Sequence, residues 1–302
     1  MAFEPSYLRL LRSGELSRRV RAAYERLAAC DLCPRACGVN RREGAGGTCR
    51  TGELARVASY HPHFGEEAPL VGSSGSGTIF FSWCNLKCVY CQNYEISQLG
   101  EGEDVEPEEL AAMMLHLQAL GCHNINLVSP THVVPQILAG LLIAAQAGLH
   151  LPLVYNTGGY DALSTLALLD GVVDIYMPDV KYADEETARR FSHAPDYPRV
   201  NRTAVAEMHR QVGDLQLDDR GIAVRGLLVR HLVLPHSLAG TKDTLRWLAQ
   251  EVSPNTYLNI MDQYRPCYRA REYPELARPV TRSEYLEALN VARELGLRRL
   301  DR

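Results

Sequence analysis

The sequence predicts an α/β protein whose core is a partial TIM-type (β/α)6 barrel, with a cysteine-rich extension at its N-terminus and a helix at its C-terminus. Three observations support this prediction. From about residue 74 onward, six short apolar runs alternate with helix-period segments, as in repeated strand–helix units around a parallel sheet. Polar residues follow several of these runs, and four cysteines lie close together ahead of the first run.

Apolar periodicity and capping residues predict the individual elements. The six predicted strands cover residues 77–82, 124–129, 151–157, 172–180, 227–235 and 256–264. The predicted helices between them cover residues 107–120, 133–148, 162–170, 184–192 and 241–252. A last helix over 281–295 opens with Thr281 and Glu284 at the spacing of a capping box. We therefore divide the chain into an N-terminal helix and metal-binding extension (1–72), a core barrel (73–270) and a C-terminal helix (271–302).

Composition and charge narrow the class of protein. The formal net charge of −4 argues against a general nucleic-acid binder. Residues 1–30 alternate apolar and arginine residues at helical spacing and lack the apolar stretch of a signal peptide. No segment approaches a membrane span. Nine cysteines, clustered at metal-type spacing, fit a reducing compartment, so we expect a cytoplasmic protein with no membrane or nucleic-acid partner.

Three cysteines at C-x3-C-x2-C spacing follow the first predicted strand: Cys84, Cys88 and Cys91. A cluster of four irons takes four ligands, and thiolate is the usual one. A loop that supplies three thiolates leaves one iron open, which indicates chemistry rather than simple electron transfer. A zinc knuckle, which favours paired cysteines and four ligands in total, is an alternative. Buried unpaired thiols are another.

With these cysteines the segment resembles the radical S-adenosylmethionine (SAM) superfamily. Gln92 and Asn93 make it similar to the pyruvate formate-lyase activating enzymes, whose motif continues Tyr-Cys-His-Asn. Tyr90 in this motif is a candidate SAM contact. The resemblance is closest over about residues 75–265, and the whole chain resembles a subgroup in which a cysteine-rich N-terminus precedes the core.

The resemblance implies a 4Fe-4S cluster and SAM as cofactors, and an electron donor such as flavodoxin or ferredoxin. It implies an oxidoreductase that cleaves SAM reductively to a 5′-deoxyadenosyl radical, which abstracts a hydrogen atom. By the same resemblance, the substrate is a glycine of a partner glycyl-radical enzyme. Radical modification of another protein, a peptide or a small molecule is the alternative within catalysis. A non-catalytic iron-sulfur carrier or scaffold is a further alternative, although a simple carrier does not need an open iron.

Barrel enzymes collect reactive groups at the carboxyl ends of their strands, and several candidates for cofactor binding lie there. The resemblance implies SAM contacts for Asn156 and Thr157, although the glycine pair after them also fits a tight turn. Asp179 and Lys181 match an Asp-x-Lys of the activating enzymes and share one face of a strand. Their alternative role is a salt bridge at the barrel mouth. Arg230 matches an arginine on the fifth strand and can bind a carboxylate bidentately.

Two strand ends depart from the activating enzymes. Where those enzymes carry Gly-Gly-Glu after the second strand, this chain has Ser129, Thr131 and His132 around Pro130. We expect Ser129 and Thr131 to bind SAM differently, whereas His132 faces the ligand or has a structural role. After the sixth strand, Gln263 and Tyr264 stand where the activating enzymes carry a histidine.

Cys267, just after the sixth strand, is the candidate catalytic residue. A thiol at the barrel mouth can donate a hydrogen atom to a substrate radical or ligate a metal, whereas a buried spectator thiol is the alternative. Residues 61–67, which contain two histidines and two glutamates, are expected to form a solvated linker.

The four cysteines of the N-terminal extension lie within twenty residues of one another: Cys30, Cys33, Cys37 and Cys49. They form a complete ligand set for one closed metal site. Zinc and an auxiliary iron-sulfur cluster both suit thiolate ligands. Disulfides are the alternative in an oxidising compartment.

Overall fold

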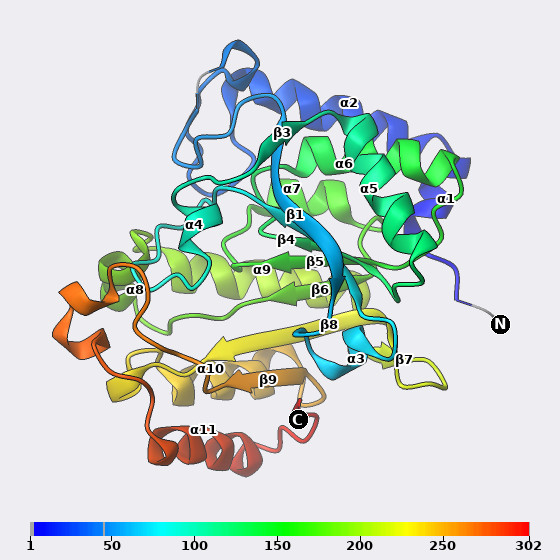
Figure 1. Cartoon of the computed structure of the whole chain (residues 1–302). Coiled ribbons are helices and arrows are strands. Elements are labelled where there is room, and N and C mark those ends of the chain that lie inside the picture. The colour runs from blue at the N-terminus through cyan, green and yellow to red at the C-terminus, as the bar shows by residue number, and fades with distance from the viewer. Residues whose placement is uncertain (1–2, 45, 302) are drawn as a thin grey trace.

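The computed structural model describes residues 3–44 and 46–301, in which nine strands form one mixed sheet (Figure 1). Six of these strands run parallel and neighbour one another in chain order. They are β2 (Ser76–Phe81), β4 (Ile125–Val128), β5 (Leu153–Thr157), β6 (Ile175–Pro178), β8 (Ala223–Leu232) and β9 (Tyr257–Met261). Each of them overlaps one of the six predicted strands. The predicted α/β class and its parallel core are therefore confirmed.

Three further strands complete the sheet in antiparallel orientation. β1 (Ala55–His63) pairs with β2, β3 (Glu103–Val105) pairs with β1, and β7 (Gln216–Leu217) pairs with β8. The prediction of a solvated linker over 61–67 is therefore wrong for its first three residues, which belong to β1. The extension predicted over 1–72 also contributes this strand to the sheet of the barrel.

Helices cover the outside of the sheet and connect its parallel strands. The α-helices are α1 (Ser6–Arg12), α2 (Glu15–Glu25), α3 (Ala68–Val71), α4 (Tyr94–Ser97), α5 (Pro107–Ala119), α6 (Val134–Gln146), α7 (Leu163–Leu169), α8 (Glu185–Ser192), α9 (Tyr197–Val212), α10 (Thr241–Trp247) and α11 (Arg282–Glu294). The predicted N-terminal helix is present as two helices, α1 and α2, and five of the six helices predicted after residue 106 are found close to their predicted bounds. The sixth, predicted over 241–252, is α10 followed by a π-helical turn, and α9 was not predicted.

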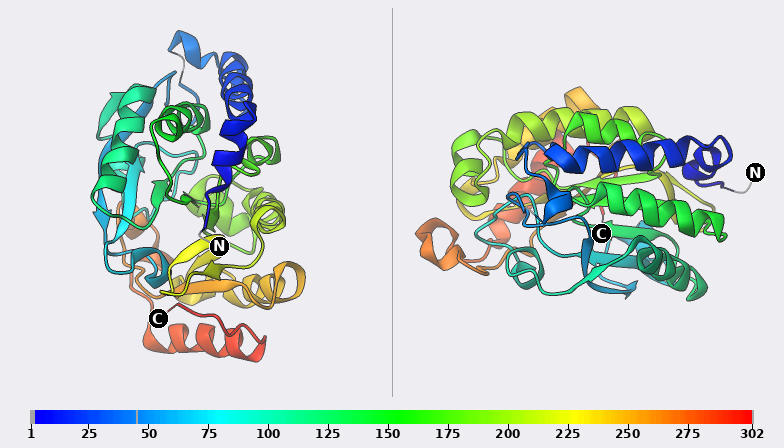
Figure 2. Two further views of the ribbon diagram at one scale, coloured as in Figure 1. Left: turned by 90° about the vertical axis from the view of Figure 1, so that its right-hand side faces the viewer. Right: turned by 90° about the horizontal axis from the view of Figure 1, so that it is seen from above.

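The helices pack in a layer around the curved sheet, as the views in Figure 2 show. α2 lies along α6, and α11 packs against α10. α5 and α6 approach closely at Gly140, where an added Cβ would lie 3.1 Å from the Leu110 side chain. Among the described residues, none of the helices has the length and apolar character needed to cross a membrane.

The capping box predicted for the last helix is present at the start of α11. The Thr281 hydroxyl accepts the Glu284 backbone N–H at 3.3 Å, and the Glu284 carboxylate accepts the Thr281 N–H at 2.8 Å. We expect Thr281→Ala to lower the free energy of unfolding by about 1 kcal/mol, because the helix loses one of its N-terminal acceptors. Urea titrations measure this loss. Glu287→Ala, an exposed change on the same helix, is the control, and equal stability of the two variants would contradict the prediction.

Candidate functional site

The loop that carries Cys84, Cys88 and Cys91 follows β2 and is tied to the barrel by its backbone. The Val89 N–H donates to the Phe191 carbonyl at 2.8 Å, and the Lys87 N–H donates to the Ser192 carbonyl at 3.2 Å. Trp83, directly before the first cysteine, has a φ of 67°, a conformation that costs energy for a bulky side chain. Its indole lies against Gly100, where no Cβ fits. The surrounding contacts therefore hold the loop in a strained shape.

The three thiols have hydrogen-bond partners within the loop and at the ends of α4 and α8. Cys88 Sγ lies 2.9 Å from Ser192 Oγ, and Cys91 Sγ lies 3.0 Å from Ser97 Oγ. The Leu86 N–H donates to Cys84 Sγ at 3.4 Å. Burial raises the pKa of Cys84 to about 12 and also raises the pKa of Cys91. A bound cation therefore favours the thiolate forms of Cys84 and Cys91 at neutral pH.

One cavity of about 1070 Å³ joins these cysteines to the carboxyl ends of the parallel strands. Its wall contains all three thiols and most of the residues predicted to bind SAM. The predicted residues on this wall are Tyr90, Ser129, Asn156, Thr157, Asp179, Lys181 and Arg230. Apolar side chains from Leu86, Val128, Leu232 and Met261 cover other parts of it. The structure thus brings Cys84 and Met261, which lie 177 positions apart in the sequence, to one cavity.

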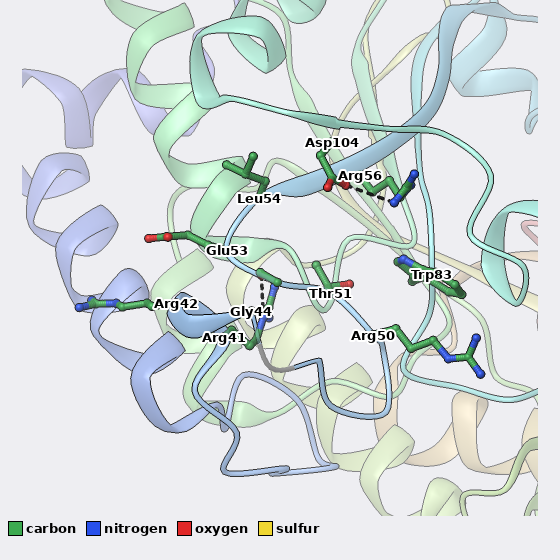
Figure 3. A pocket seen from close by; sticks show the side chains of 11 residues that line it. Arg41, Arg42, Gly44, Arg50, Thr51, Glu53, Leu54, Arg56, Trp83 and Asp104 are labelled. Carbon is green, nitrogen blue, oxygen red and sulfur yellow. Dashed lines mark hydrogen bonds and ion pairs between the residues drawn. The ribbon is translucent and has the colours of Figure 1, made fainter.

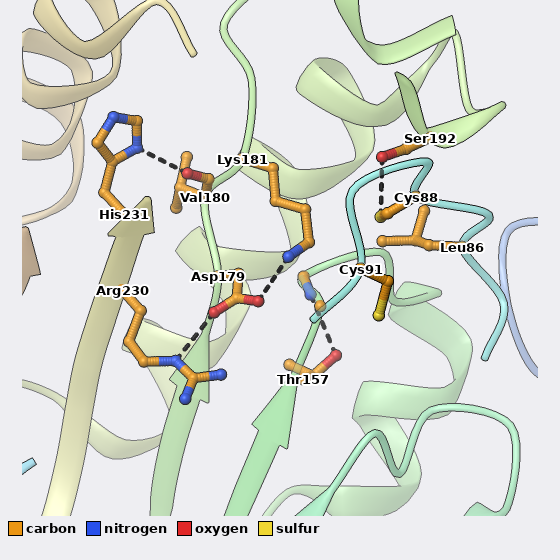
Figure 4. A network of polar contacts seen from close by, with 12 residues as sticks. Leu86, Cys88, Cys91, Thr157, Asp179, Val180, Lys181, Ser192, Arg230 and His231 are labelled. Atoms are coloured by element: carbon orange, nitrogen blue, oxygen red, sulfur yellow. Dashed lines mark hydrogen bonds and ion pairs between the residues drawn. The ribbon is translucent and has the colours of Figure 1, made fainter. Parts of the chain in front are cut away.

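An ion network forms the strand side of this cavity (Figure 4). Asp179 accepts from Lys181 Nζ at 2.7 Å and from Arg230 Nε at 2.9 Å, and Arg230 also donates to Asn156 Oδ1 at 2.6 Å. Burial alone raises the pKa of Asp179, but the two adjacent cations bring it below its ordinary value. The wall therefore carries an ionised carboxylate and two cations, with more positive than negative charge facing the cavity.

Glu66 is part of this network, although its segment was predicted to be solvated. Its side chain is only 8% exposed, and Glu66 Oε2 lies 3.6 Å from Arg230 Nη1. Glu67 is also buried and accepts from Asn259 Nδ2 at 2.9 Å. The prediction of a solvated linker is wrong here too. The sequence signal was that the two acids directly precede the short apolar helix α3.

Other predicted residues lie beside the cavity rather than on its wall. Thr131 donates to Asp161 Oδ1 at 2.8 Å, in a buried network that braces the strand ends through Thr157. His132 is buried, and its Nε2 lies 2.9 Å from the Ser82 carbonyl. Burial lowers the pKa of His132 to about 3, so the ring is neutral and Nε2–H donates this bond. These contacts give Thr131 and His132 structural partners away from the cavity.

Tyr90 lies on the cavity wall, and its hydroxyl belongs to a chain of buried hydroxyl groups. Its hydroxyl lies 2.6 Å from that of Tyr182, which lies 2.7 Å from Ser192 Oγ. Cys267 lies just beyond β9, is partly exposed and is not among the wall residues. Its carbonyl accepts the Ala270 N–H at 2.9 Å. Its participation in turnover stays a prediction.

Two further cavities lie around the N-terminal extension. All four extension cysteines line a small one. The other, of about 600 Å³, is rich in arginine and has Trp83 on its wall (Figure 3). Arg50 lies over the Trp83 ring at 5.2 Å in that second cavity. None of the predicted SAM contacts lies on either wall.

The donor set at the large cavity fits a 4Fe-4S cluster. In the described ranges, 3–44 and 46–301, no three His, Cys, Asp or Glu side chains converge on the position of a single metal ion. A cluster does not require such convergence, because each thiolate binds a different iron. A partial barrel with a three-thiol loop at the end of its first parallel strand therefore defines a class of enzyme that uses an iron-sulfur cluster.

The chain belongs to the radical SAM superfamily. The family model described as Radical SAM superfamily matches residues 78–214. Uncharacterized protein MJ0674 of Methanocaldococcus jannaschii is 31% identical over 304 residues, which span 98% of this chain and 83% of that relative. Membership supports an enzyme that cleaves SAM reductively, with a 4Fe-4S cluster and SAM as its cofactors.

Two solved structures are similar at low identity. One, described as the structure of TYW1 with a lysine-pyruvate adduct bound, has a TM-score of 0.44 and 13% identity over 72% of this chain and 73% of the other. The second is a radical SAM methyltransferase from Sphaerobacter thermophilus, with a TM-score of 0.48 and 12% identity over 73% of this chain and 64% of the other.

The buried Glu66 makes the stability of the protein depend on pH. Burial raises its pKa above the ordinary value, against the opposing effect of Arg230. A carboxyl group whose pKa is raised by folding stabilises the protein below its unfolded pKa, and this contribution is lost as pH rises through the folded pKa. We expect the wild-type free energy of unfolding to fall relative to Glu66→Gln as pH rises from about 4 to about 8. Urea titrations across this range measure the difference, with Glu287→Gln as an exposed control. Parallel pH profiles for wild type and Glu66→Gln would contradict this assignment.

Proposed function

We propose that this protein is a radical SAM oxidoreductase that binds its 4Fe-4S cluster through Cys84, Cys88 and Cys91 and binds SAM against the strand ends. One observation carries the proposal: the three thiols and the ion network of Asp179, Lys181 and Arg230 line the same cavity. Bound together, the cluster and SAM supply a 5′-deoxyadenosyl radical that abstracts a hydrogen atom. The residues of the chain bind and orient the cluster and SAM, and they exclude water.

The residues on the wall suit the different parts of SAM. Arg230 presents a planar guanidinium and Lys181 an ammonium group, which fit the methionine carboxylate. Asp179 holds both cations in place through hydrogen bonds of 2.7 and 2.9 Å. Asn156 and Ser129 offer an amide and a hydroxyl for the ribose and the methionine amino group. The apolar side chains on the wall limit access of water to the reacting atoms.

The substrate that we propose is a glycine of a partner glycyl-radical enzyme. The support is twofold: the segment from Tyr90 to Asn93 is similar to that of the activating enzymes, with Gln92 in place of their histidine, and Asp179 and Lys181 match their Asp-x-Lys. A protein of the reducing cytoplasm, with flavodoxin or ferredoxin as its electron donor, fits this proposal. Modification of another protein, a peptide or a small molecule is the second candidate, supported by the strand ends at Ser129 and Gln263, which differ from the activating enzymes.

The first test removes the proposed cluster ligands one at a time. We expect Cys84→Ala, Cys88→Ala and Cys91→Ala each to lose about four irons per chain, because a cluster with two protein ligands is not retained. SAM cleavage, measured as 5′-deoxyadenosine formed after reduction, should fall to background. Cys122→Ala, at a buried cysteine in the hydrophobic core, is the matched control. Full cleavage activity in any of the three variants would refute the ligand assignment.

A second test addresses SAM binding at the ion network. Asp179→Asn keeps the shape of the side chain but removes the charge that holds Arg230 and Lys181. We expect the Kd for SAM to rise about tenfold or more, since a hydrogen bond to a charged group contributes about 1.5–3 kcal/mol. Equilibrium dialysis of the anaerobic, cluster-loaded protein measures the Kd. Asp243→Asn, which removes an exposed ion pair with Arg246, is the control.

An unchanged Kd for SAM, together with a lower unfolding temperature of Asp179→Asn, would show that the network only braces the barrel. The substrate needs a separate experiment. The reduced protein is incubated with SAM and a candidate glycyl-radical enzyme whose glycines carry deuterium. Deuterium in the 5′-deoxyadenosine supports the glycine proposal. Cleavage of SAM without deuterium transfer or a glycyl radical would leave the radical SAM activity standing and remove that substrate.

A further inference from the structure

The four cysteines of the N-terminal extension are brought to one cavity by tight backbone turns. The Cys30 N–H donates to the Val39 carbonyl at 3.0 Å, and the Gly38 N–H donates back to the Cys30 carbonyl at 2.9 Å. All four cysteines line one small cavity, and all four are unbridged. Disulfides, the alternative considered from the sequence, are therefore not formed between them.

A buried cation faces the same cavity without a carboxylate partner. Arg41 is 1% exposed, and its guanidinium donates to the carbonyls of Gly52 at 3.0 Å and His132 at 2.8 Å. Its Nη1 lies 3.8 Å from Cys30 Sγ, and its Nη2 has no hydrogen-bond partner. No Asp or Glu within residues 3–44 and 46–301 forms an ion pair with it. A buried cation is costly unless a negative group opposes it, so this cavity is built for an anionic occupant.

We propose that Cys30, Cys33, Cys37 and Cys49 bind a second iron-sulfur cluster. An iron-sulfur cluster held by four thiolates carries a net negative charge. This charge opposes the buried Arg41 guanidinium, which has no carboxylate partner in the protein alone. Zinc also binds four thiolates, but it requires all four sulfurs at about 2.3 Å from one ion. In the described part of the chain, no three of these thiols converge in that way. The proposed ligands of the first cluster, Cys84, Cys88 and Cys91, likewise do not converge on one ion position.

The second site packs against the loop that carries the first. Arg35, on the wall of the small cavity, donates through Nε to the Asn85 carbonyl at 2.9 Å. Asn85 directly follows Cys84 and is itself buried. A cluster with four protein ligands has no open iron, so it binds no substrate and is limited to a structural or electron-transfer role. The inference is independent of the substrate proposed above.

The test compares three proteins reconstituted anaerobically with iron and sulfide in the presence of zinc. They are the wild type, the triple variant Cys84→Ala/Cys88→Ala/Cys91→Ala and the quadruple variant Cys30→Ala/Cys33→Ala/Cys37→Ala/Cys49→Ala. We expect about eight irons per chain in the wild type and about four in each variant, with matching acid-labile sulfide. After reduction, the EPR signal of the quadruple variant should change on addition of SAM, and that of the triple variant should not.

Zinc without sulfide in the triple variant would overturn the cluster assignment, and absence of any metal would overturn the site. Two milder variants guard against misfolding of the quadruple variant. Cys37→Ser removes one partly exposed ligand, and Gly47→Ala places a Cβ 2.7 Å from Cys37 Sγ. Both should lower iron content toward four per chain, with unchanged far-ultraviolet circular dichroism. Cys122→Ala is the matched control, and full iron content in Cys37→Ser and Gly47→Ala would contradict the proposal.

Discussion

Two backbone hydrogen bonds between the cysteine loop and the end of α8 determine where the thiols lie. They fix Lys87 and Val89 against Ser192 and Phe191, and the Ser192 hydroxyl then contacts the Cys88 thiol. The strand before α8 is β6, which ends immediately before Asp179. A single strand–helix unit therefore positions one proposed cluster ligand and the central carboxylate of the ion network, so the two sides of the cavity cannot shift independently.

Cations lie at both cysteine sites, partly buried at the large cavity and fully buried at the small one. Lys181 and Arg230 lie at the large cavity and Arg41 at the small one, in a chain whose net charge is −4. Cations kept out of water favour the ionised form of neighbouring thiols and of bound carboxylates. Because the same low-polarity surroundings raise the pKa of Cys84, the charge of each site depends on its occupant. Binding of metal and ordering of the surrounding loops are thereby linked.

The six parallel strands were predictable because each is a buried apolar run between turn residues. α9 carried a usable signal that was missed, since its buried residues Asn201, Ala204, Val205 and Met208 recur at helical spacing. β1 was hidden by Pro62, which lacks the N–H that a strand between two neighbours requires. Pro62 is tolerated because β3 pairs only with residues 55–57, leaving that side of the strand free. Burial of Glu66 against Arg230 depends on contacts 164 positions apart, which no local pattern encodes.

The arrangement of the outer strands also affects association between copies of the protein. An unpaired strand edge is a template for association between chains. On one side the sheet ends in β3, which is three residues long and exposes Glu103 and Asp104. On the other side, the segment around Leu300 bridges to Leu258 of β9. The first edge of this open, curved sheet is thus short and negatively charged, and the second is partly covered, so both features disfavour edge-to-edge aggregation.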